Sequence, residues 1–408
     1  MGYTANAIKG FSWQTIQKIA TIGLGVVKMV ILARILSPLD FGLFSIVTIA
    51  LGVAEATTET GVNFTIINSK HSIGYFLNTA WVIAIVRGFL IGSVMLVAAL
   101  FLSQFFEEER LLLLVSLASL TPVIKGFINP AIVALRKELR FYNESGYHLS
   151  RILVETLLAI ILTIVTRDIS ALLFAMIGAA LFEVAISFIF FSLRPQFQYL
   201  HSRGKIILEH AGGLSITALL SYLNENLDNL LIGKIVSPYG LGLYHNSYSL
   251  THKVTHDFGK SAAHGTFAIF SKMTNQPHRL QRAVLKSIGG TLGLSILASL
   301  PLLIWPNLVV LVLGSQWVEA VPLIRLLVLG GLLHGVSSMV YSYFMAQETL
   351  YKVNIHLFGT VVLMAFFVVV LGSRFGLQGA VWGIFLSRII TFPLLGFQVY
   401  QHWQFEKK

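Results

Sequence analysis

The sequence predicts an all-α polytopic membrane protein with about twelve transmembrane helices, arranged as two six-helix lobes that repeat in parallel. Three observations support this fold class. Of the 408 residues, 55% are hydrophobic and 12% are charged, whereas about 25% of the residues in soluble domains are charged. Twelve apolar segments are long enough to cross a bilayer. A segment of the first half also recurs in the second half, 200 residues further along the chain.

The predicted helices cover most of the chain and leave only short connections. In chain order they are 14–35, 42–64, 78–101, 111–133, 148–166, 170–193, 213–235, 241–268, 286–312, 323–345, 353–373 and 378–400. The third, ninth and eleventh segments are the most apolar, whereas the first, second, seventh and eighth contain more polar side chains. No connection is long enough to fold as a domain, so we expect the protein's mass to lie in the membrane.

The basic residues predict the orientation of these helices. Sixteen Lys and Arg side chains flank one side of the helices, and five flank the other side, which also has the acidic run Glu107–Glu109. Cytoplasmic loops are enriched in Lys and Arg, so we expect both termini in the cytoplasm. The basic residues are spread along the chain and form no single patch, so the net charge of +11 does not indicate a nucleic-acid partner.

The internal repeat lies at the turn between the first two helices of each half. Ala33–Phe44 aligns with Gly233–Tyr244, and Ile, Ser, Pro, Gly and Leu recur at identical positions. Ser-Pro ends one helix and Gly lets the next helix start close by, so each copy predicts a tight outer turn. The duplication divides the chain into an N-terminal lobe, 1–204, and a C-terminal lobe, 205–408. Secondary transporters use this layout, with the substrate site between the halves.

The first copy of the turn, ARILSPLDFG at 33–42, resembles the AR-x-L-x-P-x-x-F-G turn of polysaccharide-export flippases in the multidrug/oligosaccharidyl-lipid/polysaccharide (MOP) superfamily. Three further segments resemble motifs of that family. They are NLDNLLIGK at 226–234 running on to GLY at 242–244, LRKELRF at 135–141, and GSQW at 314–317 followed by AVPL at 320–323. Together the four segments identify the chain as similar to this family.

The resemblance implies a Wzx-type flippase with a MOP/MATE-like fold. Such proteins move undecaprenyl-pyrophosphate-linked oligosaccharide repeat units across the bacterial inner membrane by alternating access, for O-antigen, capsule or exopolysaccharide synthesis. A cationic central cavity would suit such a substrate. The implied partners are the lipid-linked oligosaccharide, membrane lipids, and polysaccharide polymerase and export proteins. The alternatives are a MATE-like drug or cation antiporter and a flippase for the peptidoglycan lipid precursor.

Ionisable side chains within the predicted helices are the candidate site residues, because they are costly in lipid and usually face a cavity or each other. In the first half, Lys18, Lys28 and Arg87 are candidates for lining the cationic cavity. Glu55 and Glu59, one helical turn apart, are candidates for coupling to an ion. The alternative is that Lys28 or Arg87 pairs with Glu55 or Glu59 to hold helices together, while Lys18 extends to the cytoplasmic surface.

In the second half, the candidates lie in the seventh and eighth helices. In the seventh helix, Asn224 is a candidate for hydrogen-bonding sugar hydroxyls, and Glu225 and Asp228 are candidates for binding a coupling cation. The alternative is that Asp228 pairs with Lys234 and stabilises the turn. Lys253, Asp257 and Lys260 recur at helical spacing on one face of the eighth helix, which predicts a basic stripe facing pyrophosphate. Asp257 is a coupling candidate or a partner of Lys260. His256, beside the stripe, either titrates near neutral pH or is simply hydrogen-bonded.

Enzyme signatures are missing from the sequence. There is no Walker loop, no HExxH, and the four Asp residues lie far apart. The chain has no cysteine, so disulfides and thiolate metal sites are excluded. We therefore expect no catalytic residues, cofactor or metal, although a membrane enzyme of glycan assembly is a further alternative.

Overall fold

The computed structural model describes residues 3–58, 61–69, 71–138, 140–209 and 211–405. These residues form helices and loops, and no strand occurs among them. They group into two compact units: the first contains residues up to Leu36 and Ile46–Glu225, and the second contains Ser37–Ser45 and the chain from Asn226 onward. This grouping does not test the lobe boundary predicted at 204/205, which remains a prediction.

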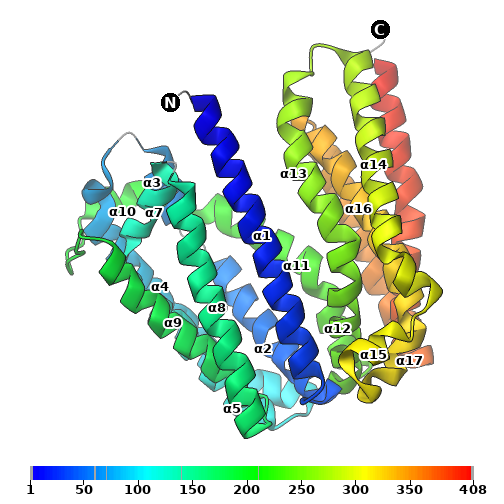
Figure 1. The fold of residues 1–408 in the computed structure, drawn as a ribbon, viewed down its shortest axis with the longest axis horizontal. Coiled ribbons are helices and arrows are strands. Elements are labelled where there is room, and N and C mark those ends of the chain that lie inside the picture. The colour runs from blue at the N-terminus through cyan, green and yellow to red at the C-terminus, as the bar shows by residue number, and fades with distance from the viewer. Residues whose placement is uncertain (1–2, 59–60, 70, 139, 210, 406–408) are drawn as a thin grey trace. The chain divides into compact units, whose positions relative to one another are not determined.

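The longest helix of the first unit is α4, which is strongly apolar and spans Ile73–Phe106. The elements of this unit are α1 (Tyr3–Ala33), most of α2 (Pro38–Thr57), α3 (Val62–Asn68), α4, α5 (Arg110–Ala118), α6 (Leu120–Lys125), η1 (Pro130–Ile132), α7 (Val133–Lys137), α8 (Phe141–Thr166), α9 (Ser170–Phe190) and α10 (His201–Leu208). α4 packs on α5 and α6, while α8 packs on α1 and α9 (Figure 1). Gly88 of α4 touches the backbone of Pro122 in α6, so these two helices approach closely.

The second unit is arranged around α16. It contains most of α11 (Ala211–Ile235), followed by α12 (Pro238–Val254), α13 (His256–Lys272), α14 (Pro277–Ile304), α15 (Leu308–Leu313), η2 (Ser315–Ala320), α16 (Val321–Ala346) and α17 (Leu350–Phe405). α12, α13, α14 and α17 all pack against α16. Gly259 of α13 faces Gly335 of α16, and a Cβ on Gly259 would lie 2.5 Å from the Gly335 Cα. The missing side chains therefore let α13 and α16 meet backbone to backbone.

The described helices account for the twelve predicted segments. Eight described helices are long and apolar enough to cross a membrane, and the pair Arg110–Lys125 and Pro130–Lys137, bent by 68° at the break, makes nine if it is counted as one span. α17 contains two predicted segments, which meet where Gly376 has φ 60° and ψ −143°. α11 and the pair α12–α13 correspond to the two segments in which the sequence has most polar residues. The all-α polytopic fold class is thus confirmed.

Four predicted helices are not continuous. The second is interrupted between α2 and α3, and the ninth between α14 and α15. The other two are the fourth and the eighth. The fourth predicted helix breaks before Pro130, which lacks a backbone donor, and the Asn129 side chain accepts a hydrogen bond from Ala131 N at 3.0 Å to start η1. The eighth breaks at Thr255, where φ is −117° and ψ is −77°. A uniform helical period through Lys253 and Asp257 was therefore the wrong geometry for this segment.

The two copies of the repeated turn contact each other within the second unit. Pro38 and Pro238 each begin a helix, α2 and α12. A Cβ on Gly42 would overlap the Pro238 carbonyl, and a Cβ on Gly242 would overlap the Pro38 carbonyl. The repeated glycines are thus required by a reciprocal backbone contact, which the sequence alignment alone did not reveal.

We predict that Gly242→Ala destabilises the protein by about 1–3 kcal/mol, the usual cost of inserting a methyl group where there is no room. The new Cβ has to displace the Pro38 backbone. Thermal unfolding of the purified protein in detergent would measure the change. Gly290→Ala is the matched control, because no atom lies within 4 Å of the Cβ position at that helical glycine. Equal melting temperatures for the two variants would contradict the contact.

Candidate functional site

A chain of ion pairs links three helices of the first unit. The Lys28 Nζ of α1 lies 3.0 Å from Glu155 Oε1 of α8, and Arg151 Nη1 lies 3.2 Å from Glu155 Oε2. Arg151 Nε in turn lies 3.8 Å from Glu183 Oε2 of α9. Because an unmatched charge is costly in a membrane, these pairs allow four ionised side chains to lie within apolar helices.

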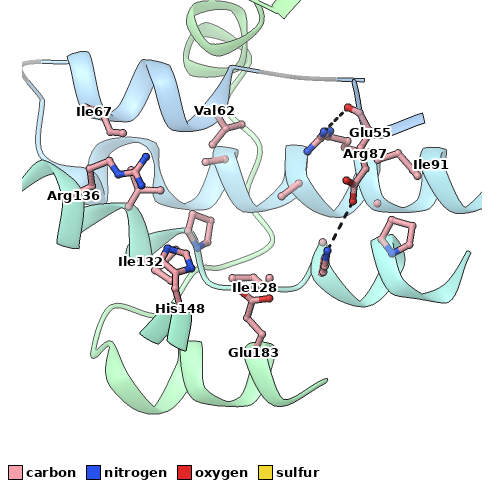
Figure 2. A pocket seen from close by; sticks show the side chains of 18 of the residues that line it. Glu55, Val62, Ile67, Arg87, Ile91, Ile128, Ile132, Arg136, His148 and Glu183 are labelled. Carbon is pink, nitrogen blue, oxygen red and sulfur yellow. Dashed lines mark hydrogen bonds and ion pairs between the residues drawn. The ribbon is translucent and has the colours of Figure 1, made fainter. Parts of the chain in front are cut away.

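A pocket of about 390 Å³ opens beside this network in the first unit. This volume lies within the range of small-molecule sites. Its polar lining consists of Glu55, Arg87, Lys125, Arg136, Glu144, His148 and Glu183, and the remaining lining is mostly aliphatic. Figure 2 shows Arg87 and Glu55 at one end of the pocket and Arg136 and His148 at the other. The three cations and three carboxylates of this lining could contact both an anionic group and hydroxyl groups.

Arg87 joins the end of α2 to α4. Its Nε donates to the Thr58 carbonyl at 2.7 Å, and its Nη2 donates to the Glu55 carbonyl at 2.8 Å. The last carbonyls of a helix lack partners within the helix, so the guanidinium stabilises the end of α2. The Glu55 carboxylate lies 3.9 Å from Lys125 Nζ of α6. Arg87 therefore both lines the pocket and fixes its wall.

Glu144 has spare hydrogen-bonding capacity at the other end of the pocket. Its Oε1 lies 2.6 Å from Arg136 Nη2, but the buried Oε2 has no hydrogen-bond partner among the residues that the structure describes. An unsatisfied buried oxygen costs about 1–3 kcal/mol. This oxygen is consequently available to a donor that enters the pocket.

The predicted residues of the first half are only partly brought together. Arg87 and Glu55 both line the pocket. Lys28 pairs with Glu155, a partner that was not among those proposed from the sequence. Lys18 is exposed on α1. Glu59 lies outside the described residues.

In the second unit, Asp228 is buried in a hydrogen-bonded cluster. The Tyr244 hydroxyl of α12 donates to Asp228 Oδ2 at 2.6 Å. The Asn229 N–H donates to Asp228 Oδ1 at 2.8 Å, and Arg388 of α17 faces the same carboxylate. Asp228 and Tyr244 belong to the two parts of one family-like segment, 226–234 and 242–244, and their hydrogen bond joins these parts.

The other candidates of the second half do not line the pocket described above. Glu225 is exposed on α11. Lys253 lies in the last turn of α12, whereas Asp257 and Lys260 lie in α13, beyond the break at Thr255. Asp257 Oδ1 is 3.5 Å from His256 Nδ1. The side chain of Asn224 lies outside the described residues.

Sequence reasoning missed several pocket residues. Lys125 and Glu183 are single charges near or within apolar segments, and His148 begins a predicted helix. Arg136 lies in the LRKELRF segment, which was the one available signal. Among the described residues, no group of three or more His, Asp or Glu side chains has the geometry to hold a metal ion.

The chain is similar to proteins of polysaccharide synthesis. The model of a family described as polysaccharide biosynthesis protein matches residues 31–322. A membrane protein in the cps region of Klebsiella pneumoniae is 24% identical, over 96% of this chain and 81% of that protein. The lipopolysaccharide biosynthesis protein WzxC of Escherichia coli strain K12 is 23% identical, over 96% and 80%.

Solved structures show the same fold. An inward-facing multidrug resistance MATE family transporter of the MOP superfamily superposes with a TM-score of 0.71 at 15% identity, covering 98% of this chain and 99% of that one. The lipid II flippase MurJ, in an inward closed conformation, gives 0.70 at 14% identity, covering 95% and 87%. These likenesses confirm the predicted MOP/MATE-like fold. Since the family model covers most of its length, the chain belongs to the polysaccharide biosynthesis protein family.

Proposed function

We propose that this protein moves a lipid-linked oligosaccharide, carried on undecaprenyl pyrophosphate, from the cytoplasmic to the outer leaflet of the bacterial inner membrane by alternating access. Family membership in polysaccharide biosynthesis supports the substrate class. The relatives named for lipopolysaccharide and teichuronic acid synthesis support it as well. Both termini lie in the cytoplasm in this proposal, because the Lys and Arg excess marks that side.

The observation that supports this function best is the polar pocket of the first unit. Arg87, Lys125 and Arg136 supply the positive charge that a pyrophosphate or an acidic sugar needs. Glu144 and Glu183 supply acceptors for sugar hydroxyls, and the aliphatic lining keeps the pocket compatible with apolar helices. We propose that a polar part of the substrate enters this pocket during transfer. Lys253, Lys260 and His256 remain proposed contacts in the second unit.

The same pocket argues against the drug antiporter. Selection of cationic drugs favours an excess of carboxylates, but the described lining has three cations and three carboxylates. A precursor flippase for peptidoglycan would need similar charges, and family membership favours a surface polysaccharide over that precursor. We propose a non-enzymatic transporter that supplies a polymerase and export proteins.

Deletion of the gene in its host should remove one surface polysaccharide and cause lipid-linked repeat units to accumulate on the cytoplasmic leaflet. Without transfer, a polymerase on the outer face has no substrate. Lectin staining of the cell surface and gel analysis of glycans would measure this. Normal surface glycans combined with altered sensitivity to cationic dyes would contradict the proposal and favour the antiporter.

Glu155→Gln should destabilise the protein by about 2 kcal/mol, below the range for fully buried pairs. The substitution leaves Lys28 and Arg151 without their shared carboxylate, and the Glu155 side chain is 24% exposed. Glu138→Gln is the matched control, because its partner Arg140 lies 3.8 Å away in a pair that is 55% exposed on both sides. Melting temperatures in detergent would measure both changes.

The double variant Lys28→Met with Glu155→Leu separates a structural from a transport role. A buried ion pair can often be replaced by apolar side chains with little loss of stability, and Arg151 still has Glu183 as a partner. If the pair only holds helices together, this variant should restore surface glycan to a strain that lacks the gene. A folded double variant that fails to do so would assign the pair to transport itself.

A further inference from the structure

Three histidines that are far apart in the sequence gather in the second unit. His252 ends α12, His256 begins α13 and His334 lies in α16. The His256 and His334 rings stack with centroids 3.9 Å apart at 19°, and the His252 centroid lies 5.8 Å and 6.3 Å from the other two. In Figure 1, α13 and α16 run side by side. We call these three side chains the imidazole cluster.

One buried nitrogen of the cluster, Nδ1 of His334, has no hydrogen-bond partner among the described residues. Arg388 Nη1 lies 3.4 Å from His252 Nε2, and a guanidinium can only donate, so the hydrogen of a neutral His252 lies on Nδ1. That hydrogen faces the Tyr248 carbonyl one turn earlier, whereas the buried Nδ1 of His334 has no hydrogen-bond partner in the part of the chain that the structure describes. Buried polar atoms are nearly always satisfied in stable packing. The Nδ1 of His334 is therefore the nitrogen that can take up a proton or accept from a donor inside the unit.

The surrounding charges limit how many protons the cluster can hold in this packing. Two stacked imidazolium rings would place like charges within 4 Å of each other. The charged groups that face the histidines are Arg388 from α17 and Lys260 and Asp257 from α13. The groups that face Arg388 are Tyr244 and Tyr248 from α12, Asp228 from α11 and Tyr341 from α16. α14 contributes the uncharged Ser295 to the packing around Thr255. Additional protons thus require the rings to move apart.

A helix break and two glycines lie where the helices of the cluster meet. The helix is interrupted at Thr255, between His252 and His256. Thr255 Oγ1 contacts Gly331 of α16, and the Thr255 carbonyl lies 3.3 Å from the Cβ position of Gly335. Gly331 and Gly335 bring no side chain to this contact, so the backbone at Thr255 packs directly on α16.

We propose that His252, His256 and His334 form a proton-binding site whose occupancy is linked to the packing of α12 and α13 against α16 and α17. Protonation separates the stacked rings, and deprotonation allows them to stack as they do here. By linkage, a conformational change of the second unit takes up or releases protons. As a coupling step for oligosaccharide movement this inference rests on the proposed function, whereas proton binding itself does not.

The test measures the pH response of the conformation without substrate. Because the chain has no cysteine, Ser271→Cys in α13 and Ser373→Cys in α17 place two spin labels on exposed sites of the second unit. The distance distribution between the labels is recorded for the full chain in lipid nanodiscs between about pH 5 and 8, where histidine titrates. We expect the distribution to shift with pH, and the shift to disappear in His256→Gln with His334→Gln.

His356→Gln is the matched control. His356 is a buried histidine of the same unit that is hydrogen-bonded to the Tyr341 hydroxyl at 2.7 Å, outside the imidazole cluster. This control should keep the pH response. If the double variant does not fold, His334→Gln alone is measured in the same way and should reduce the shift.

Three results would overturn the proton site: no pH response in the parent protein, an unchanged response in the folded cluster variants, or an equal loss in the His356 control. Oligosaccharide transfer in proteoliposomes is measured in parallel. A preserved pH response without transfer would contradict only the proposed function, and transfer without a pH response would contradict only the proton site.

Discussion

Every ionised side chain that lies within an apolar helix must find its counter-charge or its hydrogen bonds inside the protein, since lipid offers neither. This constraint shapes the first unit. Glu155 joins α1 to α8 through Lys28, and Arg151 extends the connection to α9 through Glu183. The same constraint turns Arg87 toward two carbonyls at the end of α2. The polar pocket exists because these groups hold each other in place.

Residues of the family-like segments make contacts that hold turns and helix ends in place. Gly42 and Gly242 meet the backbone of the opposite turn, and the Phe41 ring packs edge-to-face on the buried Trp317, 5.5 Å away. Lys137 donates to three carbonyls at and just beyond the end of α3, those of Ile66, Ser69 and His71, at 2.7–2.9 Å. These residues identify the family because they preserve the fold. They say much less about which glycan is carried.

Composition and the repeat were sufficient to predict the fold class, because the length and polarity of a helix in lipid are properties of one segment. The site was harder to predict. Lys28 and Glu155 are 127 residues apart, and which side chain a charge meets depends on the rotation and tilt of packed helices. Arg388 and His334 are isolated polar residues in the sequence, yet both reach the imidazole cluster. Lys253 and Lys260 lie on opposite sides of the break at Thr255, so regular helical spacing could not predict how they lie relative to each other.

The most direct test of the account is transfer by the purified protein alone. Proteoliposomes containing lipid-linked oligosaccharide from the host would be treated with a glycosidase that cannot cross the membrane. Our account predicts that the protein exposes the inner-leaflet oligosaccharide to the enzyme faster than protein-free liposomes do, and that arginine and lysine variants of the pocket slow this exposure. Exposure no faster than in protein-free liposomes, with folded protein present, would contradict it.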